Sequence, residues 1–363
     1  MTLVAIVTAG DLPVLTGDFL ITTEGIEAPD RTIVLPTKGE ISASIKSTSE
    51  RTITGLDQKL CLVNDYISFG WSGKRIYARI LYGLMREEFS ENPATTDQIF
   101  SLLDRNPEIA ENLQLVGLVT DGSEQISRFQ YNARDIDTGL GSVKIAGSGE
   151  EHFLKVLNSV GKRNVIGNIT KSEESVAMLL SVTGMAMVEE LEINITIENF
   201  YGGGFEFLIP TLEDGKVKLT KFDEYVHLHW VAVIHESGDL EISLLPLIIK
   251  PFYIGDVLCI ARIANLGHAE TPADGPKHQN YISSISPCYQ KIDDSLLGGI
   301  GLPSIESFFY VNFVHVTFPD GASKRAVFVK KKPSGIQFSN DGIEKSFEST
   351  DDYFSDIRDL LLS

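Results

Sequence analysis

The sequence predicts an α+β protein in which helices cover a pair of antiparallel sheets, followed by a mainly β region after about residue 220. Two observations predict this class. Strand-like and helix-like segments occur in separate runs, in the order strands, two helices, strands, two helices and a strand. After residue 220, apolar, β-branched and aromatic runs dominate, and turn signals such as Pro319-Asp320-Gly321 separate some of them.

The first elements are a pair of strands, expected over residues 2–8 and 14–23. Residues 2–8 are typical of a buried strand, residues 14–23 are expected to be the returning strand, and the Gly-Asp-Leu-Pro segment between them supplies the turn. Residues 24–58 are polar, with prolines and a Ser/Thr-rich run, which indicates an inserted loop or short hairpins. Residues 59–70 then predict two strands around a turn at Asn64-Asp65.

Between Ile76 and residue 210 the sequence predicts four helices and three strands. Apolar side chains recur at helical spacing from Ile76 to Met85, which predicts an amphipathic helix. The other expected elements of this half are helices over about 95–104, 150–160 and 172–191, and strands over 113–120, 127–131 and 206–210.

The C-terminal half predicts strands and a final helix. Its strand-like runs are Val226 to Ile234, Leu240 to Ile249, Phe308 to Phe318 and Ala326 to Val329, and a short acidic helix is expected at about 351–362. We therefore expect two domains, residues 1–215 with an insertion at about 24–58, and residues 220–363, whose role the sequence does not indicate.

The chain has 363 residues, 43% of them hydrophobic and 22% charged, as is ordinary for a soluble globular protein. Its 50 acidic residues outnumber its 31 basic ones, for a formal net charge of −19. Such a charge repels phosphates, so we expect no binding to nucleic acid or to an anionic membrane. With no basic leader, no long apolar span and only three scattered cysteines, the chain is expected to be cytoplasmic.

Thr2 is the first candidate for chemistry. Because threonine is small, an initiator Met1 before it would ordinarily be removed, which leaves threonine as the mature N-terminus. Such a residue combines a nucleophilic hydroxyl with its own α-amino group, whose pKa of about 7.7–8.0 allows it to accept a proton near neutral pH.

Four stretches carry a family resemblance in a shared order and spacing. They are Thr2-Leu-Val-Ala-Ile-Val with Leu15-Thr-Gly-Asp18 after a turn, the segment from Lys59 to Gly73, Leu115 to Gly122, and Ile145 to Gly149. With these stretches, residues 2–210 resemble a β-type proteasome subunit or the related peptidase of bacterial two-component proteases. Both are N-terminal nucleophile hydrolases, and the resemblance implies a four-layer αββα sandwich.

The resemblance also implies roles for single residues. Thr2 is the nucleophile and its own amine is the base, because a hydroxyl attacks poorly until a base takes its proton. Lys59 would favour the unprotonated amine and the developing alkoxide, with Asp18 holding the lysine charged and in place. The N–H of Gly73 would stabilise the oxyanion, and Ser148 would support the amine and a bound water.

Further residues match the family less closely. Thr22 and Ser72 are expected to contact the substrate, although Ser72-Gly73 and Ser148 could simply cap the helices that follow them. Where the family has an aspartate three residues ahead of a serine and a glycine pair, this chain has Glu198 and Tyr201. We include Glu198 in the catalytic set, although a misplacement of about 1 Å can cost on the order of 10²-fold in rate.

The residues leave plainer interpretations open. Asp18 could be a turn-forming acid at a strand end, and Lys59 a solvated lysine at a strand start. Lys38 and Lys46 are rivals for the role of the lysine, because the segment from Asp18 to Lys59 is longer than in the family.

A metal site is not expected. The only suggestive set is Cys259, His268, His278 and Cys288, and its spacings match no ligand pattern of compact zinc sites. The sequence therefore implies neither a metal nor an organic cofactor.

The leading function is thus a proteasome-like threonine peptidase that acts on peptide or protein substrates. The resemblance implies a homo-oligomeric ring, with an unfoldase or regulator as a further partner. Two alternatives stay open. One is a catalytically inactive ring or scaffold subunit whose C-terminal domain binds a partner, and the other is an amidohydrolase that acts on a small amide.

Overall fold

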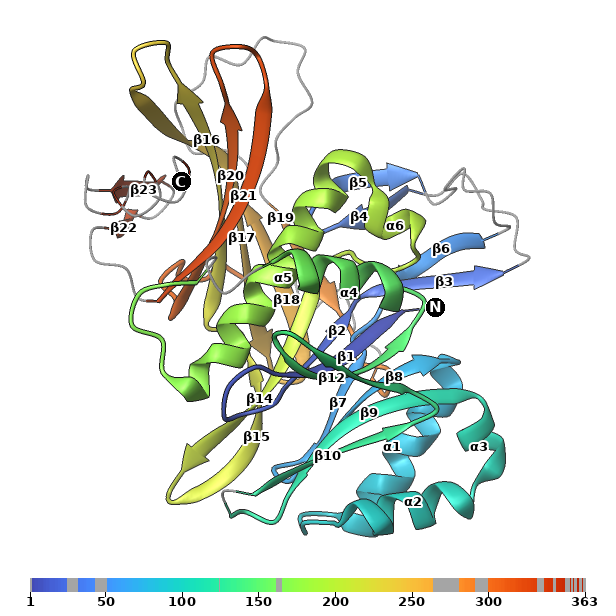
Figure 1. The fold of residues 1–363 in the computed structure, drawn as a ribbon. Coiled ribbons are helices and arrows are strands. Elements are labelled where there is room, and N and C mark those ends of the chain that lie inside the picture. The colour runs from blue at the N-terminus through green and yellow to red at the C-terminus, as the bar shows by residue number, and fades with distance from the viewer. Residues whose placement is uncertain are drawn as a thin grey trace.

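The computed structural model describes residues 2–24, 32–42, 51–123, 125–160, 165–263, 281–290, 300–331, 336–341 and 344–349, with residues 353, 355, 358 and 361. The chain is a mixed α+β protein, about half of it in strands (Figure 1). The helices are α1 (Arg75–Phe89), α2 (Thr96–Asp104), α3 (Pro107–Glu111), α4 (Glu150–Ser159), α5 (Lys171–Ile193) and α6 (Ile195–Glu198).

Two antiparallel sheets build the N-terminal half. The first has the order β11 (Arg134–Thr138), β12 (Gly141–Gly147), β1 (Leu3–Thr8), β2 (Val14–Asp18), β14 (Phe205–Glu213) and β15 (Lys216–Phe222). The second has the order β10 (Ile126–Tyr131), β9 (Leu113–Thr120), β8 (Ile67–Gly73) and β7 (Leu60–Asn64).

The C-terminal half forms a seven-stranded sheet. Its order is β13 (Val165–Ile166), β21 (Ser323–Lys331), β20 (Phe309–Thr317), β16 (Tyr225–Ile234), β17 (Leu240–Ile254), β18 (Val257–Ile263) and β19 (Tyr281–Ile285). Strand pairs outside the three large sheets are β3 (Leu20–Glu24) with β6 (Arg51–Leu56), β4 (Thr32–Leu35) with β5 (Gly39–Ser42), and β22 (Ile336–Asp341) with β23 (Glu344–Ser349).

Strand β1 is buried on both faces, which explains why its sequence is a continuous apolar run rather than an alternating one. Val4 and Ile6 face the four-stranded sheet and share a core cluster with Leu60 and Val116. Leu3, Ala5 and Val7 belong to a second cluster that includes helices α4 and α5. Because neighbours alternate faces along a strand, the side chains from Leu3 to Val7 enter the two cores in turn.

Helix α5 lies between the six-stranded and the seven-stranded sheets (Figure 1). Its buried residues share one core with β1 on one side and with Val311 and Val327 of the C-terminal sheet on the other. A helix enclosed in this way is apolar around most of its circumference, as the run from Val176 to Val188 is. The outer face of the four-stranded sheet is covered by α1, α2 and α3.

Three differences from the expected elements change how the sheets are joined. The expected strand over 14–23 is broken at Phe19, because Phe19 N and Leu20 N both donate to Gly202 O; β3 then pairs with β6 instead. The six-stranded sheet continues to Phe222, beyond residue 215, because β15 pairs along its length with β14. Strand β13, from the N-terminal half, pairs in parallel with β21 of the C-terminal sheet.

Gly184 lets α5 approach the C-terminal sheet closely. A Cβ at this position would lie 2.9–3.0 Å from side-chain atoms of Val311, Phe313 and Val327. We expect Gly184→Leu to lower the free energy of unfolding by about 2–3 kcal/mol through overpacking, measured by urea denaturation. Gly83→Ala in α1 is the control, because nothing lies within 4 Å of a Cβ added at this position. This substitution should raise the free energy of unfolding by about 0.5–1 kcal/mol. Equal effects of the two substitutions would contradict this packing.

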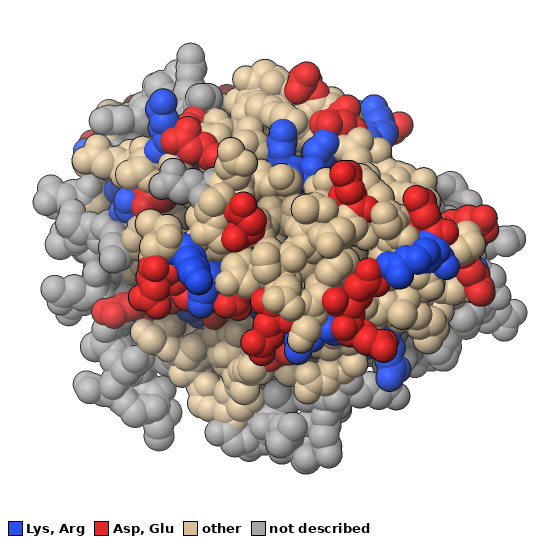
Figure 2. Space-filling model, turned by 90° about the horizontal axis from the view of Figure 1, so that it is seen from below, with Lys and Arg blue, Asp and Glu red and all other residues tan. Residues whose placement is uncertain are grey.

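Charge on the surface is mixed. On the face seen in Figure 2, acidic and basic side chains lie interspersed rather than in separate patches. Within the described part of the chain, no helix is long and apolar enough to span a bilayer.

Candidate active site

A pocket of about 880 Å³ opens beside the start of β1 and the end of β8. The predicted site residues that line it are Thr2, Thr22, Lys59, Ser72, Gly73 and Ser148. These residues come from five separate segments of the chain, and the sheet pairings bring them together. Gly147, which pairs with Leu3, has a φ of +112° and lies so close to Thr2 O that a Cβ there would overlap it. This glycine therefore sets the approach of β12 to Thr2.

The Thr2 hydroxyl donates to Asp18 Oδ1 at the floor of the site. Thr2 is 1% exposed and Asp18 is fully buried. Asp18 also accepts from the main chain: Leu3 N donates to Oδ1 at 2.8 Å, and Gly202 N donates to Oδ2 at 2.9 Å. Burial raises the pKa of Asp18, and the nearby Lys59 charge and these donors oppose that rise.

Lys59 is fully buried at the start of β7. Its Nζ lies 4.6 Å from the ring centroid of Trp71 and has no hydrogen-bond partner among the described residues. Gly17 allows the lysine stem to pack closely, because a Cβ on Gly17 would lie 2.9 Å from Lys59 Cβ. Burial lowers the pKa of Lys59, and the negative charge of Asp18 is the largest effect that opposes it.

The relation between Asp18 and Lys59 differs from the expected one. We expected Asp18 to hold the lysine, but its oxygens accept from Thr2 and from main-chain N–H groups instead. The two side chains interact through their charges, without a hydrogen bond between them in the described residues. Asp18 therefore holds the threonine directly, and Trp71 faces the lysine.

Neither serine caps the helix that follows it. The N-cap of α1 is Lys74 and that of α4 is Gly149, so the capping interpretation of Ser72 and Ser148 is wrong. Ser148 Oγ donates to Phe200 O at 3.3 Å, which joins β12 to the loop before β14. Gly73 has a φ of +122° and lies against Asn112 O with no room for a Cβ.

Glu198 is not brought to this pocket. It lies exposed on the single turn of α6 and is absent from the pocket lining. Of the two rival lysines, Lys38 donates to Asn194 Oδ1 and Glu190 O and does not line the pocket, whereas Lys46 lies outside the described residues.

Two buried side chains, Glu190 and Tyr201, fix the glycine loop, and the sequence did not single out Glu190. Glu190 on α5 accepts from Gly203 N at 2.8 Å and from Thr196 Oγ1 at 3.0 Å. Tyr201 is buried, and its hydroxyl lies 2.6 Å from His152 Nδ1 on α4. Tyr201 therefore fills the space behind the loop rather than the pocket. An acid at the end of the apolar run of α5 was the available signal for Glu190.

The expected absence of a compact zinc site concerned residues that the structure describes only in part. His268 and His278 lie outside the described residues. No group of three or more His, Cys, Asp or Glu side chains suited to a metal occurs in the part that is described. Cys288 lies beside Cys61 instead, with 3.6 Å between the two sulfur atoms.

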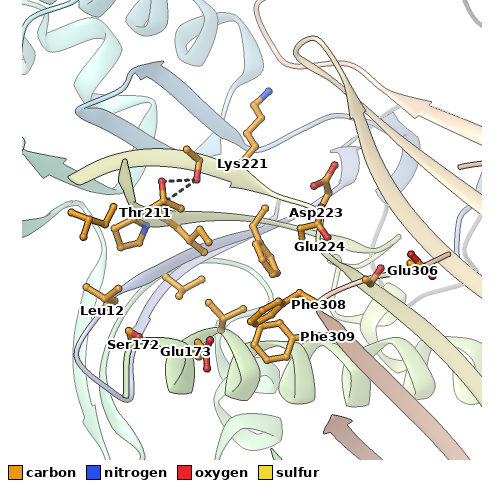
Figure 3. Close-up of a pocket in the computed structure, with 18 of the residues that line it drawn as sticks. Leu12, Ser172, Glu173, Thr211, Lys221, Asp223, Glu224, Glu306, Phe308 and Phe309 are labelled. Atoms are coloured by element: carbon orange, nitrogen blue, oxygen red, sulfur yellow. Dashed lines mark hydrogen bonds between the residues drawn. The ribbon is translucent and has the colours of Figure 1, made fainter. Parts of the chain in front are cut away.

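A second pocket, of about 1030 Å³, contains none of the predicted residues (Figure 3). It lies at the far end of β1 and β2 from Thr2, near Leu12, between the β14–β15 hairpin and the start of α5. Phe308 and Phe309 contribute to its apolar part, and Glu224 and Glu306 to its acidic part.

Comparison with protein-family models and with curated protein sequences gives no match to this chain.

Proposed function

We propose that this chain is an N-terminal threonine hydrolase that cleaves peptide bonds, and that its two packed sheets and their helices form the αββα sandwich of that class. One observation carries the proposal. Thr2 lines a pocket together with Lys59, and its hydroxyl donates a hydrogen bond to the buried carboxyl of Asp18. Lys59 is buried and has no hydrogen-bond partner among the described residues. Buried ionisable groups around a nucleophile are typical of catalytic sites.

The reaction begins once Met1 has been removed and the Thr2 amine is free. Thr2 Oγ attacks the peptide carbonyl, and its proton passes to the α-amine. The oxyanion that forms is stabilised by the N–H of Gly73 and by the positive charge of Lys59. The intermediate then expels the leaving amine, which takes the proton from the α-ammonium group, and an acyl ester remains on Thr2. Water, deprotonated by the same amine, releases the acid and restores the hydroxyl.

Asp18 orients the nucleophile in this mechanism. Because its two oxygens accept from Leu3 N and Gly202 N, the carboxyl cannot rotate freely, and it fixes the threonine side chain in one rotamer. Its charge also opposes the loss of the Lys59 proton that burial favours.

The pocket supports a peptide as substrate. Its size admits several residues, and Ile21, Trp71 and Leu113 give it apolar walls. Thr22 and Ser72 provide polar groups along the same walls. A homo-oligomeric ring, with an unfoldase or regulator, is part of the proposal. The exposed Ile76 and Ile80 of α1, 56% and 42% accessible, support a protein contact there.

Two measurements test the proposed function. Intact mass spectrometry should show a mature chain without Met1, because a retained methionine blocks the amine and favours the inactive scaffold. A β-lactone probe should then acylate wild type, with the adduct located on Thr2, and should not label Thr2→Ala. Equal labelling of the two proteins contradicts the assignment, and turnover of small amides without peptide turnover favours the amidohydrolase.

A further inference from the structure

Glu206 on β14 is a buried acid that the mechanism above does not use. It is 1% exposed and lies directly behind the start of β7. Its Oε1 accepts from two consecutive main-chain groups, Lys59 N at 2.5 Å and Leu60 N at 2.8 Å. The carboxyl therefore fixes the backbone from which the catalytic lysine extends.

The hydrogen bonds of the Glu206 carboxyl within the described residues are all made by one oxygen. One oxygen accepts twice, as a carbonyl oxygen can, whereas Oε2 is buried and has no partner in the described residues. A carboxylate oxygen left without a donor in such a place is costly, because its negative charge is neither hydrated nor paired. Glu190 shows the contrast, since both of its oxygens accept hydrogen bonds, from Thr37, Thr196 and Gly203.

The charge balance of the site points the same way. Asp57, the other acid beside Lys59, is paired with Arg75. If Glu206 is neutral, Asp18 is the buried acid whose charge acts most strongly on Lys59. If Glu206 ionises, a second buried anion is added, and the two cations that act on it, Lys221 and Lys59, already interact with Asp256 and Asp18, which makes that anion unfavourable in a region that excludes water.

We propose that Glu206 is a positioning residue of the Thr2 site, which fixes the main chain at Lys59 and holds a proton at neutral pH. In this state Glu206 adds no negative charge beside the lysine, and the positive charge of Lys59 acts more strongly on Thr2. The inference rests on the proposed function for its effect on catalysis, but its protonation state is a property of the folded chain. Loss of this proton places a negative charge near Lys59 and weakens the positive field at Thr2.

Titratable groups around Glu206 come from several elements. They are Lys59 and Cys61 of the β7 region, Lys221 of β15, Tyr225 of β16 and Tyr253 of β17. Asp18, Asp57 and Cys288 interact in turn with Lys59. Burial raises the pKa of Glu206 to about 8, against the opposing effects of the Leu60 and Lys59 amides and the Lys221 and Lys59 charges. The hydroxyls of Tyr225 and Tyr253 stay neutral there, because burial raises their pKa further.

The test compares Glu206→Gln with wild type. Glutamine keeps an acceptor for the Lys59 and Leu60 amides and carries no titratable proton. In wild type we expect the rate of β-lactone acylation to rise as the Thr2 amine deprotonates and then to fall about three- to tenfold above pH 8, as Glu206 ionises. In Glu206→Gln the rate should rise to a plateau. A decline that persists in Glu206→Gln assigns it to Lys59 and overturns the proposal.

A second readout does not depend on activity. The folded state binds the Glu206 proton more tightly than the unfolded state, so wild-type stability should fall as pH rises from 4.5 towards about 8 and then level off. Glu206→Gln should lack this component, whereas Glu190→Gln, the matched buried-acid control, should keep it. If the β-lactone labels neither wild type nor Glu206→Gln, the proposed function fails. The comparison of stability against pH still decides whether Glu206 holds a proton.

The same protonation can be measured in wild type, in case Glu206→Gln does not fold. The carboxyl carbon of Glu206, followed by NMR, should titrate with a midpoint near pH 8. A midpoint close to that of an ordinary glutamate, about 4.3, would overturn the proposal.

Discussion

Replacing Thr2 by alanine should lower kcat/KM for a fluorogenic peptide by about three orders of magnitude or more, because it removes the nucleophile itself. The fold should persist. The side chain makes one described hydrogen bond, to Asp18, and losing it costs on the order of 1–2 kcal/mol in the free energy of unfolding. Thermal unfolding of the same preparation checks that the loss of activity is chemical.

Thr2→Ser is the matched variant, because it keeps both the hydroxyl and the α-amine. It should retain measurable acylation, with a loss that reflects only the greater rotamer freedom of serine. An alanine variant that turns over peptides as fast as the serine variant would place the nucleophile elsewhere.

Replacing Asp18 by alanine should have the largest combined effect on stability and rate. The substitution strands the buried N–H groups of Leu3 and Gly202, each of which costs about 1–3 kcal/mol when unpaired. Part of this loss is offset, because burial already disfavours the carboxylate, as the raised pKa of Asp18 indicates. We expect a net loss on the order of 3 kcal/mol in urea denaturation, with acylation of Thr2 reduced by about 10²-fold.

Asp11→Ala provides the control at the other end of the same strand pair. Asp11 is exposed in the turn between β1 and β2, so its removal should change the free energy of unfolding by less than about 0.5 kcal/mol. Similar losses for the two aspartates would mean that Asp18 is not the buried acceptor described above.

The strands and the contents of the pocket were predictable from local signals. Hydrophobic runs and turn residues place β1, β2, β7 and β8, and the order of the motif segments brings Thr2, Lys59 and Gly73 into one pocket. Such signals lie within short stretches of sequence, where the spacing of apolar and turn residues restricts the backbone to a strand or a turn. They are sufficient to predict which segments lie together, but not which side chains form hydrogen bonds with one another.

The errors arose where packing over long sequence distances decides. Glu198 has the spacing that the resemblance requires, but it lies on a one-turn helix bounded by Asn194 and Phe200, both at a φ of 59°, and its side chain points to solvent. Glu206 reads as one polar residue in an apolar strand. Its role depends on β14 lying behind β7, which no local pattern indicates.

Strand β13 has a consequence for how the molecule holds together. After α4 the chain crosses to the C-terminal sheet, where Val165 and Ile166 pair with Val329 and Lys330, and then returns as α5. The two halves therefore depend on each other for folding. A polypeptide truncated after Phe222 would expose one apolar side of α5 to solvent and would remove the strand that pairs with β13. We expect the intact protein to melt in one cooperative step, and the truncated one to aggregate.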